Sequence, residues 1–157
     1  MKKWILFVFI IVISVIWIGF DTYKYANEYH QQRSEQARMR AKEIESSLAV
    51  TEITFYNGNQ PYTIIYGEDA DQKEMIICVP ASADHEVLVL DPSKGITAEQ
   101  AVSILKEDRQ PVSIKSVNLG VEQNIPIWEI IYINQQNRYT YYYLTFKDGE
   151  FIKRYTL

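Results

Sequence analysis

The segment Pro61-Tyr62-Thr63-Ile64-Ile65-Tyr66 has a counterpart 66 positions later, Ile127-Trp128-Glu129-Ile130-Ile131-Tyr132. The same offset brings Met75-Ile76-Ile77 onto Tyr141-Tyr142-Tyr143. Identity between the segments is low, so the repeat lies in the pattern of residue types. It predicts an α+β fold in which a helix lies across one face of an antiparallel sheet, formed twice in tandem. An unrelated run of hairpins is the alternative.

Strands are predicted on both sides of the first segment, at 51–56, 62–66, 74–79 and 86–90. Asn57-Gly58 predicts a tight hairpin whose turn residues have positive φ. The polar stretch Asp91-Pro92-Ser93-Lys94-Gly95 interrupts the pattern, and it predicts a boundary between a first subdomain, 35–91, and a second, 92–157.

The second half begins with a predicted helix. Thr97 and Gln100 have the spacing of a capping box, and an apolar face follows, formed by Ala98, Ala101, Val102 and Leu105. Strands are predicted at 112–122, 125–133, 139–146 and 151–155. The alternation of the first of these changes phase near Ser116, which predicts a β-bulge.

A helix is also predicted before the first half, over 21–48. Its outer part carries one apolar stripe, made by Ala37, Ala41, Ile44 and Leu48. Residues 21–34 have no such stripe and are interpreted as a stalk. Contact between the stalk and a neighbouring membrane protein is the alternative.

The N-terminal segment Trp4–Phe20 contains seventeen residues and no charge. As a helix it is roughly 25 Å long, slightly shorter than a hydrocarbon core of about 30 Å. The segment predicts a transmembrane anchor at 4–20 that contacts the lipid bilayer. Lys2 and Lys3 place residues 1–3 in the cytoplasm and the C-terminal domain outside, in a single-pass protein of the cell membrane. A cleaved signal peptide is the alternative, although Trp17-Ile18-Gly19-Phe20 lacks the small residues of a cleavage site.

Charge excludes one class of partner. The chain has 16 basic and 20 acidic residues, and without Lys2 and Lys3 the remainder has 14 basic residues and a formal charge of −6. A domain of this sign is not expected to bind nucleic acid. The single cysteine, Cys78, excludes an internal disulfide.

No catalytic, cofactor-binding or metal-binding residue is predicted. Cys78 lies within a predicted strand, where a thiol behaves as a small buried apolar group. His30 and His85 belong to no recognisable triad or metal-ligand spacing. The acidic turn 68–71 lacks the pattern of a calcium loop and is interpreted as solvated.

Tyrosines are the remaining feature. Tyr139, Tyr141 and Tyr143 share one face of a predicted strand, and Tyr142 lies on the opposite face. One face packs under a helix, so we expect Tyr142 to point inward and the other three to form a partner-binding surface. The alternative is that these three tyrosines cover the neighbouring half of the molecule.

Five motifs occur in a fixed order along the chain: Pro61–Gly67, Cys78-Val79-Pro80, Gly95-Ile96-Thr97, Ile127–Tyr132 and Phe146–Glu150. This ordered set resembles the TseB-like cell-wall elongation regulators, small PepSY-like membrane proteins of Gram-positive bacteria. The chain departs from the family at Asp71-Gln72, where a glycine is expected.

The resemblance implies two cystatin-like (PepSY-like) halves outside the membrane. It also implies a non-enzymatic regulator of cell-wall elongation and cell shape that acts in peptidoglycan synthesis by binding a penicillin-binding protein, the elongation transpeptidase. It implies no site residues. The alternative function is that of a PepSY-like inhibitor of an extracytoplasmic peptidase.

Overall fold

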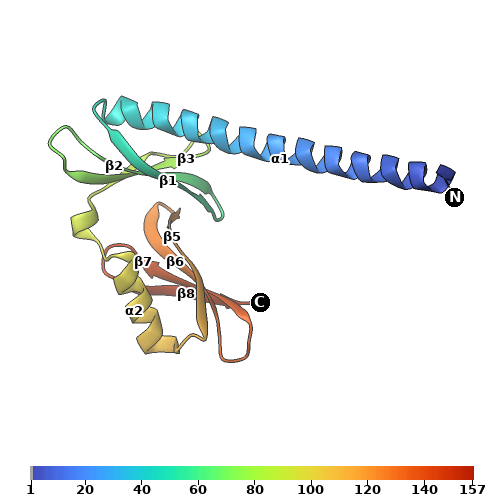
Figure 1. The fold of residues 1–157 in the computed structure, drawn as a ribbon. Helices are drawn as coiled ribbons and strands as arrows, with labels where there is room; N and C mark the ends of the chain where they lie inside the picture. Colours follow the sequence, from blue (N-terminus) through green and yellow to red (C-terminus); the bar gives the residue numbers. More distant parts are fainter. Residues whose placement is uncertain (1) are drawn as a thin grey trace. The chain divides into compact units, whose positions relative to one another are not determined.

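The computed structural model describes the backbone of residues 2–157, and the side chains of residues 4, 12–20, 24 and 28–157. The chain divides into two compact units, residues 1–36 and 37–157. Two four-stranded antiparallel sheets and two long helices make up the fold, which confirms the predicted α+β class (Figure 1).

The helix α1 (Lys2–Ile44) runs through the predicted anchor and stalk without a break. Within the described side chains, no helical stretch is long and apolar enough to cross a membrane. The side chains of residues 2–3 and 5–11 lie outside the described part. The anchor at 4–20 and the tail at 1–3 therefore stay predictions.

The first sheet is a meander of four strands, in the order β1-β2-β3-β4. The strands are β1 (Ala49–Asn57), β2 (Pro61–Glu68), β3 (Glu74–Pro80) and β4 (Leu88–Leu90). The last turns of α1 pack against one face of this sheet, and Ala37 and Ala41 form an apolar cluster with Ile65 and Ile77. The predicted stripe is wrong at Ile44, which is exposed, because the helix ends there and Leu48 reaches the core from the following turn.

The opposite face of the first sheet is buried as well. Ile64 and Ile65 are both fully buried, but Ile64 belongs to a second, larger apolar cluster that also contains residues of the second half. Adjacent residues of a strand point to opposite faces. The continuous apolar run Ile64-Ile65 therefore reflects a sheet that is covered on both sides.

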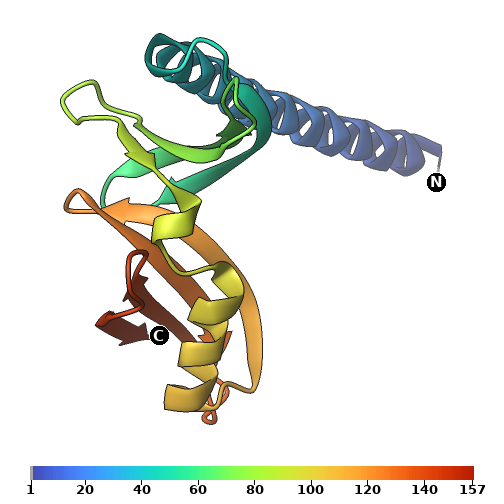
Figure 2. The ribbon, with the colours of Figure 1, turned by 90° about the vertical axis from the view of Figure 1, so that its left-hand side faces the viewer.

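The second sheet repeats the meander in the order β5-β6-β7-β8. Its strands are β5 (Ser113–Glu122), β6 (Ile125–Ile133), β7 (Tyr139–Thr145) and β8 (Phe151–Thr156). The short 3-10 helix η1 (Pro92–Lys94) and the helix α2 (Ala98–Arg109) precede it, and Figure 2 shows α2 lying along the sheet. The predicted tandem repetition of a helix and a four-stranded sheet is thereby confirmed.

Local signals in the second half are confirmed in detail. Thr97 and Gln100 form both hydrogen bonds of the capping box, and α2 buries Ala101 and Leu105. The register of β5 against β6 shifts between Ile114 and Ser116, where the bulge is predicted.

The predicted hairpin at Asn57-Gly58 is wrong in its turn geometry. Asn57 pairs with Pro61, so the loop has three residues, and neither Asn57 nor Gly58 has a positive φ. The two-residue turn lies instead at Gln123-Asn124, whose φ values are 49° and 66°. Asparagine adopts the left-handed conformation more readily than most residues, which suits this turn.

Gln72 provides a test of backbone strain. Its φ is 61° in the turn between β2 and β3, at the place where the resemblance predicts a glycine. The left-handed conformation costs a side-chain-bearing residue about 1–2 kcal/mol, and glycine avoids this cost but loses more entropy on folding. Gln72→Gly is therefore expected to raise the free energy of unfolding by about 0.5–1 kcal/mol.

Chemical denaturation checks this prediction. The matched control is Gln60→Gly, in the loop between β1 and β2, where φ is negative; it is expected to lower stability. If Gln72→Gly lost as much stability as the control, the backbone at Gln72 would not be strained.

Candidate functional site

Strand β7 places the three predicted partner-binding tyrosines at different depths. Tyr139 is 51% exposed, Tyr141 is partly buried, and Tyr143 is only 7% exposed. They alternate along the strand, as expected, but the expectation that Tyr143 lies on an accessible surface is wrong. Tyr143 belongs to the large apolar cluster.

Contacts from the neighbouring strands explain the burial of Tyr143. Its hydroxyl donates to Glu129 Oε2 at 2.8 Å, and its ring packs edge-on against Tyr155, with 6.1 Å between centroids. Lys153 Nζ lies 4.6 Å from the centroid of the same ring. Burial and the adjacent Glu129 carboxylate raise the pKa of Tyr143 well above its usual value. For Tyr143, the alternative interpretation of the sequence therefore applies: this tyrosine covers the neighbouring part of the molecule instead of forming an open surface.

Tyr155 replaces Tyr143 on the accessible part of this face. It is 54% exposed, and it pairs directly with Tyr141 across the β7–β8 ladder, so both rings lie on the same side of the sheet. The alternation of residues 151–155 shows that Tyr155 points to one face of its strand. Which face of the sheet this is depends on the register of β8 with β7, which the sequence pattern does not give. We call Tyr139, Tyr141 and Tyr155 the tyrosine face.

Tyr142 points to the opposite side, as predicted. It is 1% exposed, and its hydroxyl donates to Asp108 Oδ2 on α2 at 2.8 Å. Its ring centroid lies 5.0 Å from that of Phe151. Tyr142 therefore belongs to the core between α2 and the second sheet.

Cys78 is completely buried, as predicted. Burial raises the pKa of the Cys78 thiol to about 12, so the thiolate that a nucleophile needs is not formed near neutral pH. Within the described side chains, no group of three or more His, Cys, Asp or Glu residues is arranged to hold a metal ion.

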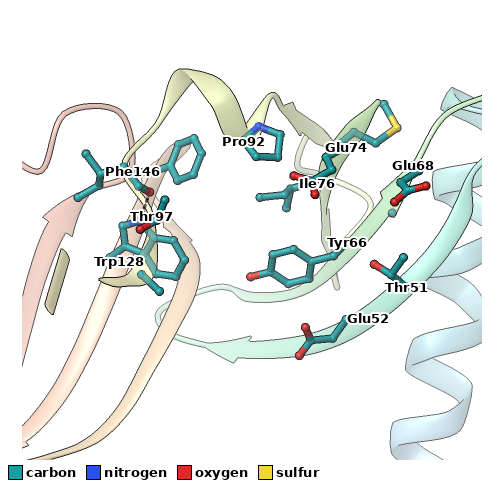
Figure 3. A pocket seen from close by; sticks show the side chains of 14 residues that line it. Thr51, Glu52, Tyr66, Glu68, Glu74, Ile76, Pro92, Thr97, Trp128 and Phe146 are labelled. Atoms are coloured by element: carbon teal, nitrogen blue, oxygen red, sulfur yellow. Dashed lines mark hydrogen bonds between the residues drawn. The ribbon is translucent and has the colours of Figure 1, made fainter. Parts of the chain in front are cut away.

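A cleft of about 360 Å³ lies between the first sheet, the linker and the second sheet, and Figure 3 shows its lining. The first sheet contributes Tyr66, Ile76 and the carboxylates of Glu52, Glu68 and Glu74. Tyr66 extends across the cleft toward Trp128, between Glu52 and Glu74 in this view. We call this site the acidic cleft. Burial raises the pKa of Tyr66 to about 12, so its hydroxyl stays protonated.

The opposite wall of the acidic cleft is aromatic and held in place by the linker. Trp128 Nε1 donates to the carbonyl oxygen of Ile96 at 2.9 Å, and the rings of Trp128 and Phe146 pack with 6.4 Å between centroids. The Ile96 amide donates to the Phe146 carbonyl at 2.8 Å. A Cβ on Gly95 would lie 2.3 Å from the Phe146 ring, so the close approach requires glycine.

Two of the carboxylates that line the acidic cleft belong to paired residues. Glu68 and Glu74 are directly opposite in the β2–β3 ladder, an arrangement that places two like charges on the same face of the sheet. The sequence pattern places Glu68 only in a solvated turn. It contains no signal for the cleft, because the lining residues come from strands and a linker that only the fold brings together.

Comparisons with known proteins agree with this architecture. Residues 49–80 match the family model of the cell wall elongation regulator TseB-like domain, and residues 95–155 match that of the peptidase propeptide and YPEB domain, PepSY. A curated relative, the probable cell wall elongation regulator TseB of Bacillus subtilis (strain 168), is 26% identical over 147 residues. That match covers 94% of this chain and 91% of the relative.

A solved structure is similar as well. The YpmB protein from Bacillus subtilis superposes with a TM-score of 0.74 at 28% identity, over 78% of this chain and 96% of that chain. The predicted resemblance to the TseB-like cell-wall elongation regulators is therefore confirmed: the first sheet matches the TseB-like family model and the second half matches the PepSY model.

Proposed function

We propose that this chain is a non-enzymatic regulator of cell-wall elongation that acts by binding a penicillin-binding transpeptidase outside the membrane. The observation that carries the proposal is the similarity to a probable cell wall elongation regulator over 94% of the chain. The predicted anchor at 4–20 would hold the domain beside membrane-bound enzymes of wall synthesis.

The chemistry of the described residues supports binding rather than catalysis. The only cysteine is buried with a raised pKa, and the accessible surface includes the tyrosine face and the acidic cleft. Tyrosines are enriched in protein interfaces because the ring can be buried while the hydroxyl stays at the wet rim. We assign the primary contact with the partner to the tyrosine face.

Affinity capture tests this assignment. The full chain, isolated from the membrane fraction in detergent, is expected to capture a penicillin-binding protein from solubilised membranes. Tyr139→Ala and Tyr141→Ala are each expected to weaken capture by about 2 kcal/mol, roughly thirtyfold, because central interface tyrosines contribute energies of this size.

The matched control is Ile125→Ala, which removes an apolar side chain at the start of β6 that is as exposed as Tyr139, and it should capture normally. Thermal melting of each variant separates binding from folding. Normal capture by both tyrosine variants would overturn the assignment to the tyrosine face. A parent chain that captures no penicillin-binding protein would overturn the proposed function, and a soluble, shortened chain would overturn the anchor.

Inhibition of an extracytoplasmic peptidase is the second candidate function. It is favoured by the match of residues 95–155 to a family model named for peptidase propeptides. Purified protein should then slow substrate hydrolysis by such a peptidase. Capture of a penicillin-binding protein with no effect on peptidase rates would exclude this alternative.

A further inference from the structure

We propose that strand β8 binds an extended, acidic segment of the partner protein as a fifth strand of the second sheet. The inference deepens the proposed function, on which it rests, by assigning a backbone contact and a charge to the partner. β8 is the last strand in the order β5-β6-β7-β8, so within the described residues no strand pairs with its outer edge (Figure 1). Five of its six residues are exposed and none is buried. A free edge of this kind offers backbone donors and acceptors to another polypeptide.

The ladder between β7 and β8 shows which backbone groups point outward. The Leu157 amide donates to the Tyr139 carbonyl oxygen at 2.9 Å, so these two residues form a hydrogen-bonded pair. Arg154 and Thr156 lie at the alternate positions, where opposite residues of an antiparallel ladder exchange no hydrogen bonds. The amide and carbonyl groups of Arg154 and Thr156 therefore point away from β7, toward the free edge.

The side chain of Arg154 indicates the charge of the ligand. Arg154 is paired with Tyr142, which points toward α2, so both side chains lie on the α2 side of the sheet. There Arg154 lines a pocket of about 410 Å³ together with Arg109 of α2, Arg138 and the turn between β6 and β7. We call this site the arginine pocket. No acidic residue lines it in the part of the chain that the structure describes, although the formal charge of the chain is −4.

The chain uses only part of this positive charge. Arg109 pairs with Asp108 at 2.9 Å, and Arg138 Nε donates to the Leu157 carbonyl oxygen at 2.6 Å. The Arg154 guanidinium, by contrast, forms no ion pair with any acidic residue among the described side chains. A carboxylate from outside would accept two parallel hydrogen bonds from this guanidinium.

A second copy of the chain is a poor occupant of this edge. In the central registers of an antiparallel pair of β8 strands, Lys153 and Arg154 of one copy would lie opposite those of the other. Like charges directly opposite are destabilising, and basic side chains on an edge strand oppose self-pairing. A segment with acidic residues at alternate positions turns this repulsion into attraction. Charge therefore selects an acidic partner segment over a second β8.

The alternation of a strand then places the side chains of the bound segment. Residues directly opposite Arg154 and Thr156 project to the α2 side, where a carboxylate opposite Arg154 meets the arginine pocket. The residues between them project to the other side, next to Tyr155. The added strand would therefore be continuous with the tyrosine face, to which we assign the primary contact.

Peptide binding tests the inference. The probe is fluorescein-labelled Thr-Val-Glu-Val-Glu-Val-Thr-amide, and fluorescence anisotropy follows its binding to the full chain in detergent. Binding is expected to be saturable and to weaken with added salt. The analogue with glutamine in place of both glutamates should bind about tenfold more weakly or worse, because charge-assisted hydrogen bonds are lost.

N-methylated peptides test the strand pairing separately from the charge. In the proposed register the two glutamates lie opposite Arg154 and Thr156, so their amides bond to β8. Methylation of both glutamate amides should abolish saturable binding. Methylation of two valine amides leaves the pairing edge intact, and that peptide should still bind. Equal binding of the two methylated peptides would exclude strand addition and overturn the inference.

The variant Arg154→Gln tests the arginine pocket. It should bind the glutamate peptide about tenfold more weakly or worse, and it should melt as the parent does because the side chain is exposed. The matched control Lys115→Gln removes an exposed cation from β5, at the opposite edge of the same sheet, and should bind normally. Equal binding by Arg154→Gln and the parent would contradict the role of the pocket and overturn the inference.

Two further results would also overturn the inference: no saturable binding of the glutamate peptide, or a dimer of the chain that the peptide dissociates, which would assign the edge to a second copy. Failure of the proposed function is distinguishable. If the parent captures no penicillin-binding protein, the proposed function fails, and the peptide experiment still decides whether β8 accepts an acidic strand. If capture succeeds and the glutamate peptide does not bind, the inference alone is overturned.

Discussion

Replacing Tyr56 by alanine is expected to lower the free energy of unfolding of residues 37–157 as a whole by about 3–5 kcal/mol, the usual cost of truncating a buried aromatic side chain. Tyr56 lies in β1 of the first sheet and is 2% exposed. Its ring occupies the space above Gly120 of β5, where a Cβ would lie 2.4 Å from the ring. The two halves therefore share this part of the core.

The Tyr56 hydroxyl forms a second contact between the two halves. It donates to Glu122 Oε1 at 3.0 Å, and the other oxygen of that carboxylate pairs with Lys153 of β8. Tyr56→Phe keeps the ring and removes the hydroxyl with its hydrogen bond to Glu122, so it should cost about 1 kcal/mol. The comparison of the two variants separates ring packing from hydrogen bonding.

Hydrogen exchange of the β6 and β7 amides provides the decisive measurement, since these strands belong to the second sheet whereas Tyr56 belongs to the first. In Tyr56→Ala their protection should fall as much as that of β1 and β2, because residues 37–157 form one compact unit and should unfold cooperatively. Unchanged protection in β6 and β7 would contradict a shared core and would favour independent folding of the predicted subdomains, 35–91 and 92–157.

Tyr142→Ala should destabilise the domain by a similar amount, about 3–5 kcal/mol, with its primary effect between α2 and the second sheet. The side chain is fully buried, and its loss removes the ring contact with Phe151 and the hydrogen bond to Asp108. Chemical denaturation measures the change.

Tyr155→Ala is the control for Tyr142→Ala. It removes the same side chain from the opposite face of the same sheet, where the ring is 54% exposed, and it should cost less than about 1 kcal/mol. Equal losses in the two variants would mean that both faces of the second sheet are core. In that case the tyrosine face would not be available to a partner.

Elements whose signals are local were predicted well from the sequence. The capping box of α2 depends on Thr97 and Gln100 alone, and the bulge near Ser116 appears as a change in the alternation of a single strand. The inward direction of Tyr142 follows from its apolar neighbours on alternate positions. Each of these features depends on residues that are close in the chain, so no tertiary information is needed.

The candidate sites depend on residues that are distant in the chain. Tyr143 had the same alternation as Tyr139, yet contacts with Glu129 and Lys153 on the two neighbouring strands bury it. Tyr155 joined the tyrosine face only through the register of β7 with β8. The sequence pattern shows which residues share a face of a strand, but it does not show which part of that face is covered.

By itself, the sequence determined the class of fold, the order of its elements and its repetition, because hydrophobic periodicity and turn residues act over short distances. The tertiary structure alone decided that the Ile64-Ile65 run is buried on both faces, and that Glu68 and Glu74 oppose Trp128 across a cleft. The physical reason is that burial and the lining of a cleft depend on which distant segments of the chain come into contact. Tertiary packing decides those contacts.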